Sequence, residues 1–175
     1  MKQNLIVIDD FLDDPDLTRQ EALEFDYSKV SHYFPGARST KKCGSDVVEI
    51  TKKLEKILDG KIKWGLESDT FHFQSCFEGS KTWIHVDDWD WAAVLYLTPD
   101  AIVDSGTGIY HVNKENRYEL NISVGNIYNR MILYRGGTLH HCSLLPGFGT
   151  TLETSRLTQV FFFDVEPNGQ EQVSL

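Results

Sequence analysis

The chain has 175 residues, of which 41% are hydrophobic and 12% aromatic, and this is enough for one domain with a sizeable core. Its 26 acidic residues outnumber its 17 basic ones, which argues against a general DNA- or RNA-binding protein because such proteins need a basic surface. The three cysteines are too few for a disulfide framework, and there is no run of about 18 apolar residues to span a membrane. We therefore expect one cytoplasmic domain over residues 1–175, without nucleic-acid or membrane partners; the oligomeric state is left open.

The first 70 residues are predicted to form a helical support for the rest of the domain. Residues 5–8 are a short apolar run typical of a buried strand. Asp14 and Pro15 then provide a cap and a first-turn proline for a helix that reaches about Glu24, and residues 31–45 are expected to form an ordered loop. A second helix is indicated by apolar residues that recur on one helical face: Val47, Ile50, Leu54, Ile57 and Leu58. Gly60 is expected to end this helix.

The pattern changes to short strands after the second helix. Apolar and polar residues alternate, and turn residues separate the runs, with strands expected at residues 71–74, 83–87, 92–98, 108–112, 127–134 and 157–164. Two helices followed by seven or eight short strands indicate a mostly β fold, a β-sandwich or jelly roll with helices packed on one face. Residues 71–165 would be the jelly-roll core.

His85 and Asp87 are separated by one residue in a predicted strand, so their side chains point the same way while Val86 points to the other face. Two histidines and one carboxylate can hold Fe(II) on one side and leave three coordination positions open. By itself the pair is weak evidence, because a hydrogen-bonded surface histidine produces the same motif. A second histidine from another strand is needed.

That second histidine would be His140 or His141. Adjacent strand residues face opposite ways, so we expect only one of the two to enter the barrel. We favour His140, which places Cys142 on the same face as a small apolar neighbour. His141 would then lie on the outer face or support a ligand from behind.

Arg156 and Thr158 also share one strand face, ahead of the strongly apolar residues 160–163. The guanidinium offers two parallel donors to a carboxylate, and the hydroxyl adds a third. A buried arginine needs an anionic partner, and no acidic residue occurs in this strand before Asp164. The pattern therefore predicts a binding site for a dicarboxylate cosubstrate.

The order of these motifs, from Phe71 to Asp164, resembles the 2-oxoglutarate/Fe(II)-dependent oxygenases, and most closely the prolyl-4-hydroxylase-like branch. The matching segments are Cys76-Phe77-Glu78-Gly79 before His85 and Asp87, then Leu95-Tyr96-Leu97-Thr98, Gly106-Thr107-Gly108-Ile109-Tyr110, His140-His141-Cys142, and Arg156 with Thr158. Residues 34–39 resemble a loop of phage- and marine-type members. The interval from His140 to Arg156 is longer than is usual in the family, with residues 144–155 as the extra loop.

The resemblance implies a double-stranded β-helix, a cupin-like jelly roll, with His85, Asp87 and His140 as catalytic iron ligands. It also implies that Tyr96 binds the far carboxylate of 2-oxoglutarate together with Arg156 and Thr158. The cofactors would be Fe(II) and 2-oxoglutarate, with O₂ as cosubstrate and ascorbate as a further candidate. Such an enzyme hydroxylates an unactivated C–H bond and releases succinate and CO₂.

Two other classes of function remain open from the sequence. One is a catalytically silent, cupin-like module that binds a metal or a ligand, and the other is a β-sandwich interaction domain without metal. For the enzyme, the substrate would be a small molecule or a peptide, either prolyl or amino-acid-like. Arg38, Trp89 and Trp91 are candidates to contact it, although packing of the two tryptophans in a solvated turn is slightly favoured. The role of His111 is left open.

Overall fold

The computed structural model describes residues 4–42, 46–67 and 69–168. The elements follow in the order β1 (Leu5–Ile8), α1 (Pro15–Glu24), β2 (Lys29–Val30), β3 (Ala37–Arg38), α2 (Val47–Leu58), β4 (Gly60–Trp64), β5 (Phe73–Cys76), β6 (Trp91–Tyr96), the 3-10 turn η1 (Val103–Ser105), β7 (Thr107–Val112), β8 (Tyr118–Val124), β9 (Met131–Tyr134), β10 (His140–Ser143) and β11 (Arg156–Pro167). The predicted succession of helices and strands is confirmed, with differences given below.

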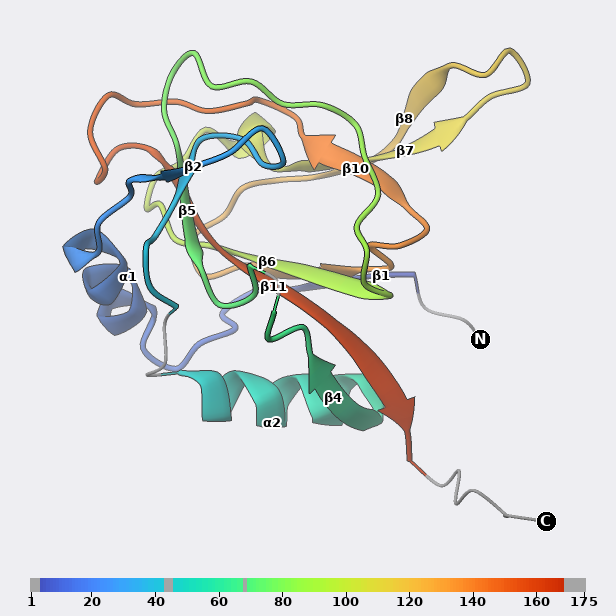
Figure 1. Ribbon diagram of the computed structural model, residues 1–175, viewed down its shortest axis with the longest axis horizontal. Helices are drawn as coiled ribbons and strands as arrows, with labels where there is room; N and C mark the ends of the chain where they lie inside the picture. The colour runs from blue at the N-terminus through green and yellow to red at the C-terminus, as the bar shows by residue number, and fades with distance from the viewer. Residues whose placement is uncertain (1–3, 43–45, 68, 169–175) are drawn as a thin grey trace.

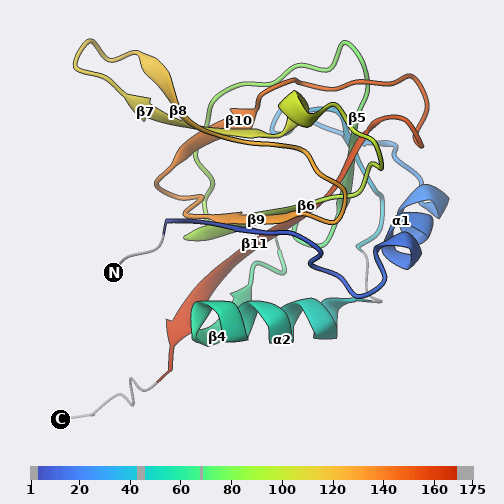
Figure 2. The same cartoon turned by 180° about the vertical axis from the view of Figure 1, so that it is seen from behind.

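The strands form two antiparallel sheets that face each other. The larger sheet has the order β1-β9-β6-β11-β5-β3-β2, with β4 paired to the far end of β11, and the smaller has the order β10-β7-β8. Figures 1 and 2 show the smaller sheet above the β9, β6 and β11 layer, with α2 beneath that layer. This is the expected jelly roll with helices on one face.

Side-chain alternation along the central strands explains these layers. In β11, Leu157, Phe161 and Phe163 point to the helix side and pack in the main core, which includes Ile50 and Leu54 of α2. Residues of the opposite parity point between the two sheets, where a second core gathers Ala92, Val94, Tyr96, Ile109, Val124, Ile132 and Tyr134. The larger sheet therefore has one face for the structural core and one face for the space between the sheets.

Both helices begin where the sequence predicts. Asp14 caps α1 by accepting a hydrogen bond from the Leu17 backbone N–H at 3.1 Å, and Pro15 opens the first turn. The end of α2 differs from the expectation, because the residue in the left-handed conformation is Asp59 (φ 48°) and Gly60 already begins β4. Gly60 is needed for close packing instead, since a Cβ there would lie 2.5 Å from the Val165 side chain.

The strand expected at residues 83–87 is absent from the described structure; this segment is irregular and makes one isolated bridge. The strand expected from Phe71 starts at Phe73, because Phe71 has a φ of +66°. The sequence analysis missed β2, β3, β4 and β8, and β3 lies within the segment that was expected to be a loop. Six of the seven residues of β8 are exposed, so burial imposes no clear pattern on it. Residues 43–45, which close the expected loop and include Cys43, lie outside the described residues.

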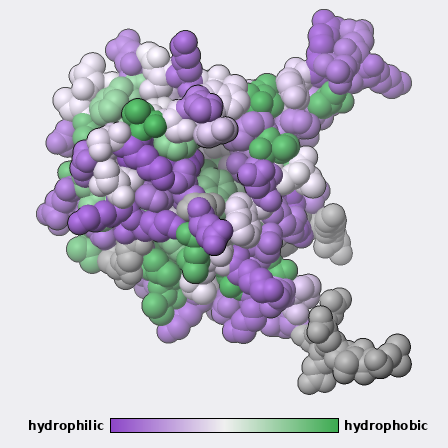
Figure 3. Space-filling model, in the orientation of Figure 1, coloured by the Kyte–Doolittle hydropathy of each residue, from purple (hydrophilic) through white to green (hydrophobic). Residues whose placement is uncertain are grey.

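The surface in Figure 3 is mostly hydrophilic, and the projecting tip of the β7–β8 hairpin is strongly so. Neither of the two helices that the described ranges contain has the length and apolar character required to cross a membrane.

Candidate active site

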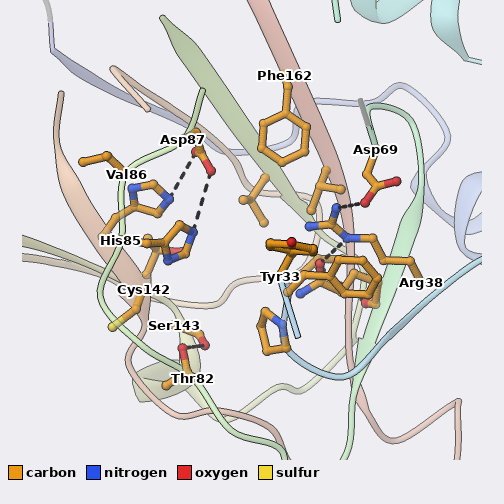
Figure 4. Close-up of a pocket in the computed structure, with 18 of the residues that line it drawn as sticks. Tyr33, Arg38, Asp69, Thr82, His85, Val86, Asp87, Cys142, Ser143 and Phe162 are labelled. Atoms are coloured by element: carbon orange, nitrogen blue, oxygen red, sulfur yellow. Dashed lines mark hydrogen bonds and ion pairs between the residues drawn. The ribbon is translucent and has the colours of Figure 1, made fainter. Parts of the chain in front are cut away.

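A cavity of about 690 Å³ opens between the two sheets. Its walls come from the loop around residues 32–35, from β3, from residues 82–89, and from β10 and β11. His85 and Asp87 lie on one side of it, and Arg38 lies on the other (Figure 4). The described wall therefore combines candidate metal ligands with two arginines, Arg38 and Arg156.

Three side chains that suit a metal ion meet in this cavity: His85, Asp87 and His141. One ligand atom from each lies within 4.8 Å of the others. His85 Nε2 is 3.7 Å from Asp87 Oδ1, and His141 Nε2 is 3.2 Å from Asp87 Oδ2. The arrangement brings two imidazole nitrogens and a carboxylate to one point, which is the donor set of a facial two-histidine, one-carboxylate iron site.

The backbone holds both histidines in place although residues 83–87 form no strand. The backbones of His85 and His141 exchange two hydrogen bonds, of 3.1 Å and 2.9 Å, and their rings lie 4.4 Å apart. The Asp87 backbone N–H donates to the Gly136 carbonyl at 2.9 Å. A short bridge to β10 thus positions the two histidines side by side.

The orientation of the two rings suits metal binding. His85 Nδ1 lies 3.0 Å from the Trp83 carbonyl oxygen, and His141 Nδ1 lies 2.8 Å from the Leu139 carbonyl oxygen. A carbonyl only accepts hydrogen bonds, so each Nδ1 carries the proton and each Nε2 presents a lone pair toward Asp87. Burial, followed by the neighbouring His141, lowers the pKa of His85, and this favours the neutral ring that a metal requires.

Asp87 gives an independent sign that a cation fits here. Its Oδ2 atom is buried and has no hydrogen-bond partner among the described residues. A buried carboxylate oxygen without a partner is costly, and a bound cation would compensate for it. Space for the carboxylate depends on Gly136, where a Cβ would lie 2.8 Å from Oδ2. The sequence analysis did not single out Gly136.

The expectation that His140 and not His141 enters the barrel was wrong, because His141 lines the cavity and His140 does not. His141 is 4% exposed and packs against the Tyr134 ring, whereas His140 lies on the outer face against the Tyr118 ring, 5.0 Å away. The register of β10 against β7 pairs His141 with Ile109, which is buried between the sheets. Alternation alone shows that the two histidines diverge, but this long-range register decides which one points inward.

Arg156 and Thr158 line the same cavity, as predicted for a carboxylate-binding pair. Arg156 is 4% exposed, donates from Nε to the Ser105 carbonyl at 2.8 Å, and makes no ion pair with any described carboxylate. Its guanidinium carbon lies 5.6 Å from the centre of the Tyr96 ring. The site thus holds a buried cation whose terminal nitrogens can serve an anionic ligand.

Tyr96 lies behind this cation, fully buried, with its hydroxyl 2.8 Å from Thr107 Oγ1. Burial raises the pKa of Tyr96, so the phenol stays protonated and can donate a hydrogen bond. Thr107, unlike Tyr96, lines the cavity, and the sequence analysis gave it no role. The binding of 2-oxoglutarate by Tyr96 stays a prediction.

Comparison with solved structures shows what this architecture is. The chain is similar to a prolyl-4-hydroxylase from Pseudomonas putida, with 14% identity, a TM-score of 0.56 and 94% of each chain covered. It is also similar to HygX from Streptomyces hygroscopicus with nickel, 2-oxoglutarate and hygromycin B bound, with 12% identity, a TM-score of 0.62, and 95% of this chain and 84% of HygX covered. The protein shares the fold of the prolyl-4-hydroxylase and of HygX.

A third similar structure with this oxygenase fold is a prolyl hydroxylase from Trichoplax adhaerens in complex with a hypoxia inducible factor peptide fragment. It has 14% identity and a TM-score of 0.55, and the match covers 92% of this chain and 84% of that one. No family model and no curated protein matches the chain. At these identities the likeness concerns the fold, so the reaction has to be argued from the site itself.

The three residues that the sequence suggested as substrate contacts do not all face the cavity. Arg38 and Trp89 line the cavity, but Trp91 does not. Trp91 is 2% exposed, lies in the core on the helix side of β6, and packs under Arg135 at 4.3 Å. Trp91 has the same strand parity as Ala93 and Leu95, which also belong to the main core, so it does not face the cavity in which a contact with substrate was expected. His111 is exposed and pairs with Glu119 at 3.2 Å, outside the cavity.

Proposed function

We propose that this protein is an Fe(II)- and 2-oxoglutarate-dependent dioxygenase that hydroxylates an unactivated C–H bond of a prolyl, peptidyl or amino-acid-like substrate and releases succinate and CO₂. The observation that carries the proposal is the convergence of His85, Asp87 and His141 in a cavity that also contains the buried Arg156. HygX, which shares the fold, holds nickel and 2-oxoglutarate, and this supports a metal ion together with 2-oxoglutarate as the ligands of the cavity.

The donor atoms define what each residue would do. His85 and His141 would bind the iron through Nε2, and Asp87 through its otherwise unpartnered oxygen, which leaves positions for 2-oxoglutarate and O₂. Iron and 2-oxoglutarate, when bound, supply the oxidising chemistry. The carbonyls of Trp83 and Leu139 keep the two rings in the ligating tautomer.

Arg156 would hold the carboxylate of 2-oxoglutarate that is remote from the metal. The Ser105 carbonyl fixes Nε, so the terminal nitrogens are oriented before the ligand arrives, and the Thr158 hydroxyl would add a donor. Val94, Val160 and Phe162 line the same cavity and would limit the access of water.

Anaerobic reconstitution tests this proposal directly. Protein loaded with Fe(II) is mixed with 2-oxoglutarate without O₂, and the visible spectrum is recorded. We expect a weak charge-transfer band, which Asp87→Ala should abolish while the circular dichroism spectrum stays that of the folded protein. A wild-type protein that binds Fe(II) but shows no band would contradict the proposal and favour a silent metal-binding module.

A further inference from the structure

A second buried arginine, Arg38, faces the same cavity, and the proposed function assigns it no role. Arg38 lies on β3, directly after the loop of residues 32–35, and is 8% exposed. Figure 4 shows its guanidinium extending toward the middle of the cavity, with His85 and Asp87 on the far side. Arg38 lies close enough to interact electrostatically with both of these residues.

Arg38 is fixed by two hydrogen bonds and keeps one donor group without a partner among the described residues. Its Nε donates to Gln74 Oε1 at 2.8 Å, and its Nη1 donates to Asp69 Oδ2 at 2.7 Å. The Phe34 ring covers the guanidinium, with its centre 4.1 Å from the guanidinium carbon. Nη2 makes no hydrogen bond within residues 4–42, 46–67 and 69–168. A cation fixed in this way is preorganised to receive an anion.

The charge balance around Arg38 also favours an anion. Asp69 pairs with both Lys29 and Arg38, so these three groups together carry one positive charge. Burial alone would raise the pKa of Asp69, but the two cations lower it, which keeps this carboxylate ionised near neutral pH. Glu67 and Asp88, the other acidic residues that line the cavity beside Asp87, are exposed at its rim.

The two carboxylates of 2-oxoglutarate do not account for Arg38. One would bind the metal that His85, Asp87 and His141 would hold, and the other would bind Arg156, which lies beside Tyr96 and Ser105. Arg38 instead stands beside Phe34, Pro35 and Phe162, apolar residues that suit the carbon skeleton of another molecule. The cavity of about 690 Å³ is of the size of small-molecule sites.

We infer that Arg38 binds a carboxylate of the molecule that is oxidised, so that the substrate is a small carboxylic acid of the amino-acid class. This inference rests on the proposed function and deepens it. Arg38 sets the position of the acid from the wall opposite His85, Asp87 and His141, and the free Nη2 donor makes the charge-assisted contact. A neutral amide of the same skeleton would offer the Nη2 donor only an uncharged oxygen, and the single positive charge that Lys29, Arg38 and Asp69 carry together would stay uncompensated.

Binding without turnover tests the inference. The full chain is loaded with Ni(II) and 2-oxoglutarate, and a panel of common L-amino acids is compared with the corresponding amides by ligand-observed NMR. We expect at least one acid to bind about 10-fold or more tightly than its amide, the strength typical of one charged hydrogen bond. Arg38→Met should remove this preference and leave 2-oxoglutarate affinity unchanged.

Two further variants keep the test decisive if Arg38→Met fails to fold. Asp69→Asn releases Arg38 from its carboxylate and should tighten acid binding, whereas Lys29→Met leaves Asp69 entirely to Arg38 and should weaken it. Arg117→Met, which removes an exposed arginine paired with Glu115 on the distant hairpin, is the matched control and should change nothing.

The outcomes separate the two proposals. If metal-loaded wild-type protein does not bind 2-oxoglutarate, the proposed function is refuted. If 2-oxoglutarate binds and Arg156→Met weakens it, but no acid is preferred over its amide or the preference survives Arg38→Met, only the role of Arg38 is refuted. In that case Arg38 serves to tie β3 to β5 through Gln74.

Discussion

Gly136→Ala should weaken metal binding without unfolding the protein. The added methyl would lie 2.8 Å from Asp87 Oδ2 and 2.9 Å from the Ala92 Cβ, whereas ordinary contacts begin at 3.4 Å. Ala92 belongs to β6, in which every residue is buried, so Ala92 cannot easily shift away from the added methyl. The Asp87 carboxylate therefore has to move. Metal sites tolerate ligand displacements of only about 0.2 Å, and disturbed ligands lose roughly 10- to 100-fold in affinity. We expect a loss of that size.

The measurement is a calorimetric titration with Ni(II), supported by circular dichroism to verify folding. Gly137→Ala is the matched control, because it adds the same methyl one residue away, where the three nearest atoms are backbone atoms of Trp89 and Asp87 and not a carboxylate. A folded Gly136→Ala protein with wild-type Ni(II) affinity would show that Asp87 does not hold the metal in this position. Equal losses in both variants would point to a general disturbance of the turn.

Three other predictions concern the metal site and the stability of the fold. His141→Ala should abolish tight Ni(II) binding and His140→Ala should preserve it, and the opposite result in the same titration would restore the other histidine as ligand. Gln159→Leu should stabilise the protein by about 1–3 kcal/mol in urea unfolding, because both polar atoms of this fully buried amide lack a described partner; a destabilised variant would contradict that reasoning. Burial lowers the pKa of His72 in the folded protein. As the pH falls, this histidine is therefore protonated in the unfolded chain before it is protonated in the folded one. The stability that is present above about pH 6.5 should be lost as the pH falls toward the lower pKa of the folded protein. His72→Gln should reduce this loss between pH 8 and pH 5 in metal-free protein, and an unchanged pH dependence would exclude His72 as its source.

The irregular segment of residues 83–90 shows how the fold fixes a site outside regular structure. Beyond the bridge to His141, the Asp90 backbone N–H donates to Asp164 of β11 at 3.1 Å, and the Asp90 carboxylate pairs with Arg135. These ties anchor the segment on both sides of Asp87. The candidate ligands are therefore held before a metal arrives, which is a requirement for a site that binds tightly.

Much of the fold and of the candidate site was accessible from local sequence patterns. The cap of α1 and the apolar face of α2 depend on residues a few positions apart, and both helices begin at the predicted residues. The same holds for the shared orientation of Arg156 and Thr158 in one strand, and both line the cavity. The pair of His85 and Asp87 was also found, although the strand that the prediction assumed does not form.

The tertiary structure decided which side chains of each strand point into the protein. Side-chain alternation along a strand shows that His140 and His141 point to opposite faces and that Trp91 and Ala93 point to the same face. It does not show which face is buried. The register of β10 against β7 turned His141 inward, and the packing of β6 on the helices turned Trp91 away. The contacts of Gly136 and Arg38 likewise join residues far apart in the chain. The sequence determined the residue types that a metal and a carboxylate need, and long-range pairing determined which of them meet.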